Sequence, residues 1–129
     1  MPQRPDDSTI SDDQRLWRRV HPSQFKPRSG TGPSEISSAV FSTREEVSVA
    51  IASETTLDLF VANHLEYGVI EFTAGAARRM GCTVVRDSLP NDPAHALVCG
   101  PRSNGQLTKT QQELLKQASR LILFRYPQR

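Results

Sequence analysis

Asn91-Asp92-Pro93-Ala94-His95-Ala96-Leu97-Val98-Cys99 is the most informative stretch of this chain, because it joins a polar turn to a predicted buried strand. A short apolar run bounded by turn residues is typical of a strand inside a sheet. Val47-Ser48-Val49-Ala50-Ile51 gives a second strand signal, since apolar and small residues alternate there with a period of two. Both stretches indicate that a β-sheet organises the fold.

Outward from these two strands, the chain alternates further strand signals with helical ones. Thr108 and Gln111 form a capping box, which predicts a helix that begins directly after Thr108. Gly81 predicts the left-handed end of a short preceding helix. Strands are predicted at 15–20, 37–41, 47–51, 68–72, 82–86 and 94–99, helices at 53–65, 74–80 and 108–119, and either a terminal strand or a last helical turn at 121–124.

This order of elements predicts a single small α+β domain. Its sheet is expected to be mixed or mostly antiparallel, with five to six strands packed by two or three helices. A length of 129 residues fits one hydrophobic core. Residues 1–14 contain one large aliphatic residue, Ile10, and no aromatic residue. We therefore predict a mobile acidic leader at 1–14 and the domain at 15–126.

Composition narrows the classes of protein that the chain can belong to. It has no run of about eighteen apolar residues, so no transmembrane helix is predicted. No basic segment followed by an apolar one opens the chain, so no secretory signal is predicted and a cytoplasmic location is expected. Cys82 and Cys99 lie in apolar runs, which favours buried thiols in a reducing compartment. With three dispersed histidines, the chain has no zinc-ligand spacing, and we expect neither a metal nor a cofactor.

Charge is segregated along the chain. Residues 14–34 carry five basic residues and no acidic one, residues 45–77 carry six acidic residues and no basic one, and residues 78–129 carry nine basic and three acidic residues. Blocks of one sign either cancel within the fold or face a partner. Arg18, Arg19 and His21 end the first predicted strand, and Lys26 and Arg28 follow in a loop rich in Pro, Gly and Ser. Arginine suits phosphate or carboxylate groups, so these five residues are the candidate binding set; the alternative is an edge strand protected by its charges.

Four residues are candidates for catalysis: His95, His21, Ser42 and Glu71. As a general base, His95 needs a carboxylate such as Asp87 or Asp92 to orient its ring. The alternative is a half-buried histidine that bonds to the turn backbone. Ser42 lacks a Gly-x-Ser-x-Gly elbow, so we interpret it as a turn residue unless the fold brings a histidine close.

Glu71 occupies the middle of the predicted strand 68–72. A strand that has one solvated face can place a glutamate on that face, and this is the expected arrangement. A buried glutamate would instead need a cationic partner, for which Arg78 or Arg79 is the candidate.

Several segments of the chain resemble those of known protein groups. Leu16-Trp17-Arg18-Arg19-Val20-His21-Pro22, Ser37-Ser38-Ala39-Val40-Phe41 and Pro93-Ala94-His95-Ala96-Leu97-Val98 resemble segments of a group of small uncharacterised bacterial proteins, which implies no activity. The order of a basic strand (Arg18, Arg19 or His21), then Ser42-Thr43, then Glu71 is similar to that of ADP-ribosyltransferase-type folds, including the RES toxin domain. This second resemblance implies an enzyme that acts on NAD or another nucleotide.

The leading hypothesis is a small cytosolic accessory or protein-interaction module that is not an enzyme. It would contact a partner protein, such as the product of a neighbouring gene, through the 22–36 loop and the basic first strand. The alternatives are the RES-like enzyme and, because of the basic stretches, a nucleic-acid-binding protein. No membrane partner is expected.

Overall fold

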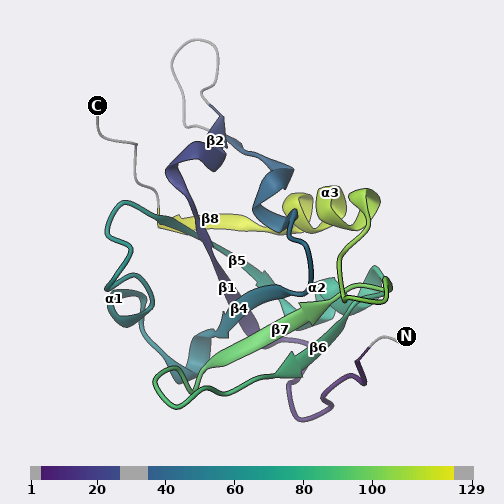
Figure 1. Cartoon of the computed structure of the whole chain (residues 1–129). Helices are drawn as coiled ribbons and strands as arrows, with labels where there is room; N and C mark the ends of the chain where they lie inside the picture. Colours follow the sequence, from purple (N-terminus) through teal and green to yellow (C-terminus); the bar gives the residue numbers. More distant parts are fainter. Residues whose placement is uncertain (1–3, 27–34, 124–129) are drawn as a thin grey trace.

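The computed structural model describes residues 4–26 and 35–123, and a six-stranded antiparallel sheet forms the centre of this part of the chain (Figure 1). The order of the strands is β6-β7-β4-β1-β5-β8, and each strand is antiparallel to its neighbours. The predicted α+β class, with its mostly antiparallel sheet, is confirmed. The strands are β1 (Arg15–Val20), β4 (Val47–Ile51), β5 (Gly68–Thr73), β6 (Thr83–Arg86), β7 (His95–Cys99) and β8 (Arg120–Leu123).

Short helices and one small ladder complete the described elements. The α-helices are α1 (Leu57–Phe60), α2 (Ala74–Arg79) and α3 (Lys109–Ala118), and the 3-10 helices are η1 (Pro22–Gln24), η2 (Ser38–Phe41) and η3 (Ala52–Glu54). A separate two-stranded ladder pairs β2 (Phe25–Lys26) with β3 (Glu35–Ile36). None of the helices in residues 4–26 and 35–123 is both long enough and apolar enough to cross a membrane.

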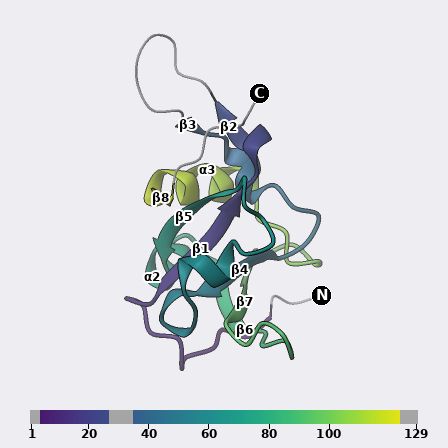
Figure 2. The ribbon, with the colours of Figure 1, turned by 90° about the vertical axis from the view of Figure 1, so that its left-hand side faces the viewer.

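The main core lies on one face of the sheet. Leu16, Ile70 and Val98 project from this face and are fully buried. Helices α2 and α3, together with η2, cover the same face and contribute Leu115 and Phe41 to the core. Helix α3 packs against η2 and α2 (Figure 2). Burial of this apolar face is the main source of stability for a domain of this size.

The opposite face of the sheet is covered over only part of its area. Phe60 and Val61, at the end of α1, pack there with Trp17 and Val69. The rings of Trp17 and Phe60 lie 6.0 Å apart between centroids. Beyond Trp17 the same face continues toward Arg15 at the start of β1, where pockets open. This uncovered end of the sheet is where polar side chains gather.

Residues 4–14 pack against the domain along β6 and α2. The amide of Asp7 donates a hydrogen bond to the carbonyl oxygen of Val84 at 2.9 Å. Arg78, on α2, bonds Asp6 at 3.0 Å and Asp12 at 2.7 Å. Ile10, the one large aliphatic residue of this segment, is only 3% exposed and belongs to the core. Within the segment predicted as a leader, Ile10 thus packs in the core, and Arg4, Asp6, Asp7 and Asp12 bond to β6 and α2.

The strand predicted at residues 37–41 is wrong, because these residues form the 3-10 helix η2. Val40 and Phe41 are consecutive and both fully buried. In a strand, consecutive side chains point to opposite faces, so only one of the two could reach the core. Ser37 begins the helix instead, since its hydroxyl accepts a hydrogen bond from the amide of Ala39 at 3.2 Å.

The long helix predicted at residues 53–65 is also wrong, since only α1 is α-helical there. Thr56 caps this helix by accepting a hydrogen bond from the amide of Leu59 at 3.2 Å. Only Phe60 and Val61 are buried against the sheet, whereas Leu65, at the end of the predicted helix, is 66% exposed. One turn is enough to place the two buried side chains, and the chain then leaves the helix.

Two local predictions are confirmed. Thr108 and Gln111 form the predicted capping box at the start of α3, and Gly81 has the predicted positive φ, 95°.

Candidate functional site

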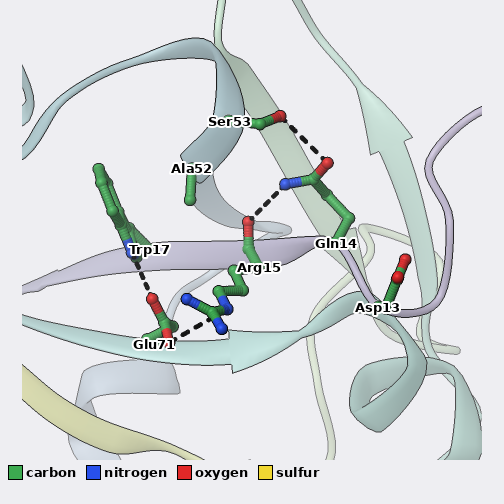
Figure 3. Close-up of a pocket in the computed structure, with 7 residues that line it drawn as sticks. All are labelled: Asp13, Gln14, Arg15, Trp17, Ala52, Ser53 and Glu71. Atoms are coloured by element: carbon green, nitrogen blue, oxygen red, sulfur yellow. Dashed lines mark hydrogen bonds and ion pairs between the residues drawn. The ribbon is translucent and has the colours of Figure 1, made fainter.

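Glu71 is a carboxylate in the middle of strand β5, next to the edge strand β8, and yet it is only 8% exposed. Its Oε2 accepts a hydrogen bond from the indole Nε1 of Trp17, its cross-strand neighbour, at 2.9 Å (Figure 3). Its Oε1 accepts hydrogen bonds from Nη2 and Nε of Arg120 at 3.1 and 3.3 Å. The expectation that Glu71 faces solvent is wrong, and its partner is Arg120 rather than Arg78 or Arg79.

Two arginines flank Glu71 and keep most of their own surface in water. The Nε of Arg15 lies 3.9 Å from Oε1 of Glu71. The side chains of Arg15 and Arg120 are 63% and 69% exposed, whereas that of Glu71 is 10% exposed. A guanidinium carries five donors, so each arginine retains donors that point away from the carboxylate. Glu71 thus anchors two cations whose outer sides remain available.

Two pockets open around this pair of charges. One, of about 300 Å³, is lined by Arg15, Glu71, Thr73, Arg79 and Arg120 together with Phe72, Ala76 and Ala118. The other, of about 420 Å³, shares Arg15 and Glu71 with the first and adds Asp13, Gln14, Trp17, Ala52 and Ser53 (Figure 3). We call the two pockets together the Glu71 cleft, and the first of them its arginine pocket.

The two halves of the Glu71 cleft differ in charge. Three guanidinium groups and one carboxylate give the arginine pocket a formal charge of +2. Asp13 and Glu71 outnumber Arg15 in the other pocket, which has a formal charge of −1. There, the amide of Gln14 is already engaged, since its Nε2 donates to the carbonyl oxygen of Arg15 at 3.2 Å and its Oε1 accepts from the Ser53 hydroxyl at 3.1 Å. The positive charge and the guanidinium donors of the arginine pocket therefore suit an anionic group.

His95 lies at the start of β7, on the same face of the sheet as Glu71. The row of paired residues Glu71, Trp17, Ala50 and His95 crosses four strands, so Trp17 and Ala50 separate the two. The Nδ1 of His95 lies 3.1 Å from the carbonyl oxygen of Asp87 and 3.1 Å from its carboxylate oxygen Oδ2. Asp87 thus supplies both the orienting carboxylate of the catalytic hypothesis and the backbone contact of its alternative.

His21 and Ser42 have local structural roles. The Nδ1 of His21 accepts a hydrogen bond from the amide of Ser23 at 3.0 Å and caps η1. Its ring packs edge-on against Tyr67 at 5.1 Å between centroids. Ser42 is the C-cap of η2, and its amide donates to the carbonyl oxygen of Ala39 at 3.0 Å. Within the described residues, no hydrogen bond or ion pair joins any two of the four catalytic candidates.

Arg18 and Arg19, the centre of the predicted binding set, direct their guanidinium groups into the domain. Arg18 donates to the carbonyl oxygens of Val40 at 3.1 Å and Ser48 at 2.9 Å. Burial lowers the pKa of Arg18 to about 10. Arg19 donates to the carbonyl oxygen of Phe60 at 2.8 Å, its guanidinium lies 4.2 Å from the centroid of that ring, and burial lowers its pKa as well. The side chain of Lys26 and the whole of Arg28 lie outside the described residues.

The arginine pocket was missed by reasoning from sequence, although part of its signal is present. Arg15 and Trp17 are two residues apart and so share a strand face, as do Glu71 and Thr73. The pairing of these two strands, which brings the residues together, is a long-range contact without a local signature. Arg120 was hidden because the sequence left open whether residues 121–124 continue a helix or form a strand.

Within residues 4–26 and 35–123, no group of three or more His, Cys, Asp or Glu side chains is arranged to hold a metal ion. The two resemblances drawn from short segments stay predictions. Comparison of the chain with protein-family models, with curated proteins and with solved structures found no match.

Proposed function

We propose that this chain is a protein-interaction module, and that its Glu71 cleft binds an acidic segment of a partner protein. The observation that carries the proposal is the convergence of Arg15, Arg79 and Arg120, from three different elements, on one pocket whose only carboxylate is Glu71. That carboxylate is already bonded to Trp17 and Arg120. An incoming carboxylate would therefore meet guanidinium donors, which form the strongest hydrogen bonds to such groups.

The shape of the cleft favours a macromolecular partner over a small metabolite. Pockets for small molecules cover most of the surface of their ligand. Here the side chains of Arg15 and Arg120 are more than half exposed, so the pocket is open to solvent on the side that they line. A peptide segment that is part of a partner protein can bind without being enclosed by the cleft.

The charge pattern favours an acidic peptide over a nucleic acid. A nucleic-acid backbone carries a charge at every nucleotide and needs a basic strip of matching length. The arginine pocket instead adjoins a pocket where Asp13 and Glu71 leave a formal charge of −1. A peptide can place one or two acidic side chains in the first pocket and neutral residues beside the second.

Trp17 provides a direct test, because it is the only tryptophan of the chain and lines the Glu71 cleft. We expect a glutamate-rich peptide to change the intrinsic fluorescence of Trp17 in a saturable titration. A lysine-rich peptide of the same length and a single-stranded oligonucleotide serve as comparisons, and neither is expected to saturate. Stronger binding of the oligonucleotide than of the acidic peptide would overturn the proposal in favour of nucleic-acid binding.

The matched variants are Arg15→Gln/Arg79→Gln and Arg44→Gln/Arg102→Gln. Both pairs remove two positive charges from exposed arginines, but only the first pair lines the arginine pocket. Arg120 is left in place because it is the partner of Glu71. We expect the first double variant to bind the acidic peptide about tenfold or more weakly, and the second to bind almost as wild type. Equal affinity of the two double variants would contradict the proposal.

A further inference from the structure

The two edge strands of the six-stranded sheet differ in what covers them. β6, at one edge, is covered by the N-terminal segment. The amide of Asp7 donates to the carbonyl oxygen of Val84 at 2.9 Å, and the amide of Val84 donates to the carboxylate of Asp6 at 2.9 Å. The hydroxyl of Thr83 donates to the carbonyl oxygen of Arg4 at 2.9 Å. The first two bonds use the C=O and N–H groups of Val84, which an added strand would need, and the third places residues 4–7 along β6.

β8 forms the opposite edge of the sheet and pairs with β5 alone among the described strands (Figure 1). In an antiparallel sheet, the backbone groups of alternate residues point to the two sides of a strand. Part of the N–H and C=O groups of β8 therefore points away from β5. Such an edge is a template on which an extended chain can add as a further strand.

The arginine pocket begins at this same edge. Arg120 is the first residue of β8, and Ala118, just before the strand, also lines the pocket. Directly opposed residues of neighbouring antiparallel strands lie on the same face with their Cβ atoms about 5 Å apart. A residue of an added strand opposite Arg120 would thus lie on the face that carries Glu71 and the pocket.

The side chains of β8 also predict which types of residue suit the added strand. Ile122 is two residues from Arg120 and packs, like Leu123, with the apolar cluster around Phe60. The register of β8 against β5 shifts there, since Leu121 pairs with Ile70 and Leu123 with Val69, so the regular alternation of β8 runs from Arg120 to Ile122. An antiparallel strand would place one residue opposite Ile122 and, two residues later, another opposite Arg120. The residue opposite Ile122 should therefore be apolar, and the residue opposite Arg120 should be acidic.

We propose that the partner segment binds by adding to β8 as an antiparallel strand, with an apolar residue opposite Ile122 and an acidic residue opposite Arg120. This inference rests on the proposed function and adds to it the backbone geometry of binding and the order of side chains. The occupant is an acidic, extended peptide. Charge complementarity with Arg120, Arg15 and Arg79, together with continuity between β8 and the pocket, supports this choice.

Backbone N-methylation tests strand addition separately from charge recognition. Three peptides share one sequence, in which leucine and glutamate occur two residues apart. One is unmodified, and the other two carry N-methyl groups on the alternate residues of one edge or of the other edge. Because only one edge of an added strand faces β8, we expect one methylated peptide to bind the full chain at least tenfold more weakly and the other to bind as the unmodified peptide does.

The outcomes separate the two proposals. If the unmodified peptide and both methylated peptides bind equally, strand addition is wrong while recognition of an acidic segment stands. If none of the three changes Trp17 fluorescence, the proposed function fails and this inference fails with it. If sedimentation shows a dimer that the peptide does not dissociate, a second copy of the chain occupies the edge and strand addition by a partner is overturned. Slower amide exchange of Leu121 to Leu123 in the peptide complex is the expected supporting result.

Discussion

Glu71 organises its surroundings at the scale of single residues. A buried carboxylate is costly unless it is paired and hydrogen-bonded. Glu71 meets this requirement through Trp17 and Arg120, at sequence separations of 54 and 49 residues. The alternation of side chains along a strand puts Val69 and Glu71 on one face, but it does not show whether that face is buried at Glu71. Burial there depends on distant parts of the chain, and no local pattern encodes it.

Glu71→Gln separates the structural role of this residue from its effect on charge. The amide oxygen can still accept from Trp17, but the ion pairs with Arg120 and Arg15 are lost. We expect the free energy of unfolding in urea to fall by about 1–3 kcal/mol. The arginine pocket loses its one negative charge, so the acidic peptide should bind several-fold more tightly. Weaker binding of the acidic peptide to this variant, measured by Trp17 fluorescence, would contradict the role given to Glu71.

Cys82 and Cys99 are buried thiols, as their apolar sequence context predicted. Burial, with a smaller effect of Cys99, raises the pKa of Cys82 to about 12, and burial also raises the pKa of Cys99. Only the thiolate reacts readily with alkylating or disulfide reagents. We therefore expect almost no labelling of the native protein at pH 8 and labelling of both thiols in denaturant. Rapid labelling of either thiol in the native state would contradict this account.

The same shift predicts how stability depends on alkaline pH. The thiol of Cys82 ionises near pH 9 when the chain is unfolded and near pH 12 when it is folded. Between these values the native state binds one more proton than the unfolded state, so stability falls as the pH rises through this window. Below about pH 9 the contribution of this group is complete. Urea unfolding in a pH series, compared with the same series for Cys82→Ala, measures the contribution of Cys82.

At the scale of elements, signals that lie within a few residues were reliable and signals that depend on packing were not. The capping box at the start of α3 is local: Gln111 donates its amide to Thr108 Oγ1, and Thr108 donates its own amide to the Gln111 side chain. Helix α3 was predicted correctly for that reason. Residues 37–41 were predicted as a strand because a short apolar run is typical of one. The 3-10 conformation of η2 depends on how Val40 and Phe41 pack in the core.

Thr108→Ala tests the capping box directly. Loss of the side-chain acceptor leaves the amide of Gln111 without a partner at the helix start, and we expect a loss of about 1 kcal/mol in the free energy of unfolding. Thr110→Ala is the control, since Thr110 is exposed within the first turn of the same helix. Equal stability of the two variants in urea unfolding would show that the cap contributes nothing.

Arg18 joins three elements, because it lies on β1 and bonds carbonyl oxygens of η2 and β4. Arg18→Met retains the apolar part of the side chain but leaves these two carbonyl oxygens unpaired. We expect a loss of about 2–3 kcal/mol in the free energy of unfolding, whereas Arg44→Met, at an exposed position, should have little effect. An Arg18→Met variant with the stability of wild type but without affinity for the acidic peptide would instead place the binding surface on the first strand.

At the scale of the whole molecule, the sheet is asymmetric in both its faces and its edges. One face is covered by α2, α3 and η2, and the other is covered by α1 only near Phe60. One edge is covered by residues 4–7, and the other carries the arginine pocket. The fold class could be predicted from the alternation of apolar residues in the strands and from the turn and cap residues between the elements. The order of the strands did not, because strand pairing is decided by long-range register, and the site depends on that pairing.

The charges of the arginine pocket predict that the affinity for an acidic peptide depends on salt concentration. Raising the ionic strength from about 0.1 M to about 1 M shortens the Debye length from about 10 Å to about 3 Å. Because the arginines of the pocket are exposed, we expect the affinity for the acidic peptide to fall several-fold over this range. Isothermal titration at several salt concentrations measures the change, and an affinity independent of salt would argue for apolar recognition instead.

The most direct test of an arginine pocket that recognises acidic segments is to follow the arginine side chains themselves by NMR during titration with the acidic peptide. We predict that the Nε–H signals of Arg15, Arg79 and Arg120 and the indole signal of Trp17 shift together and saturate, while those of Arg18 and Arg19 keep their positions. Shifts confined to Arg18 and Arg19, with the pocket arginines unchanged, would contradict the account.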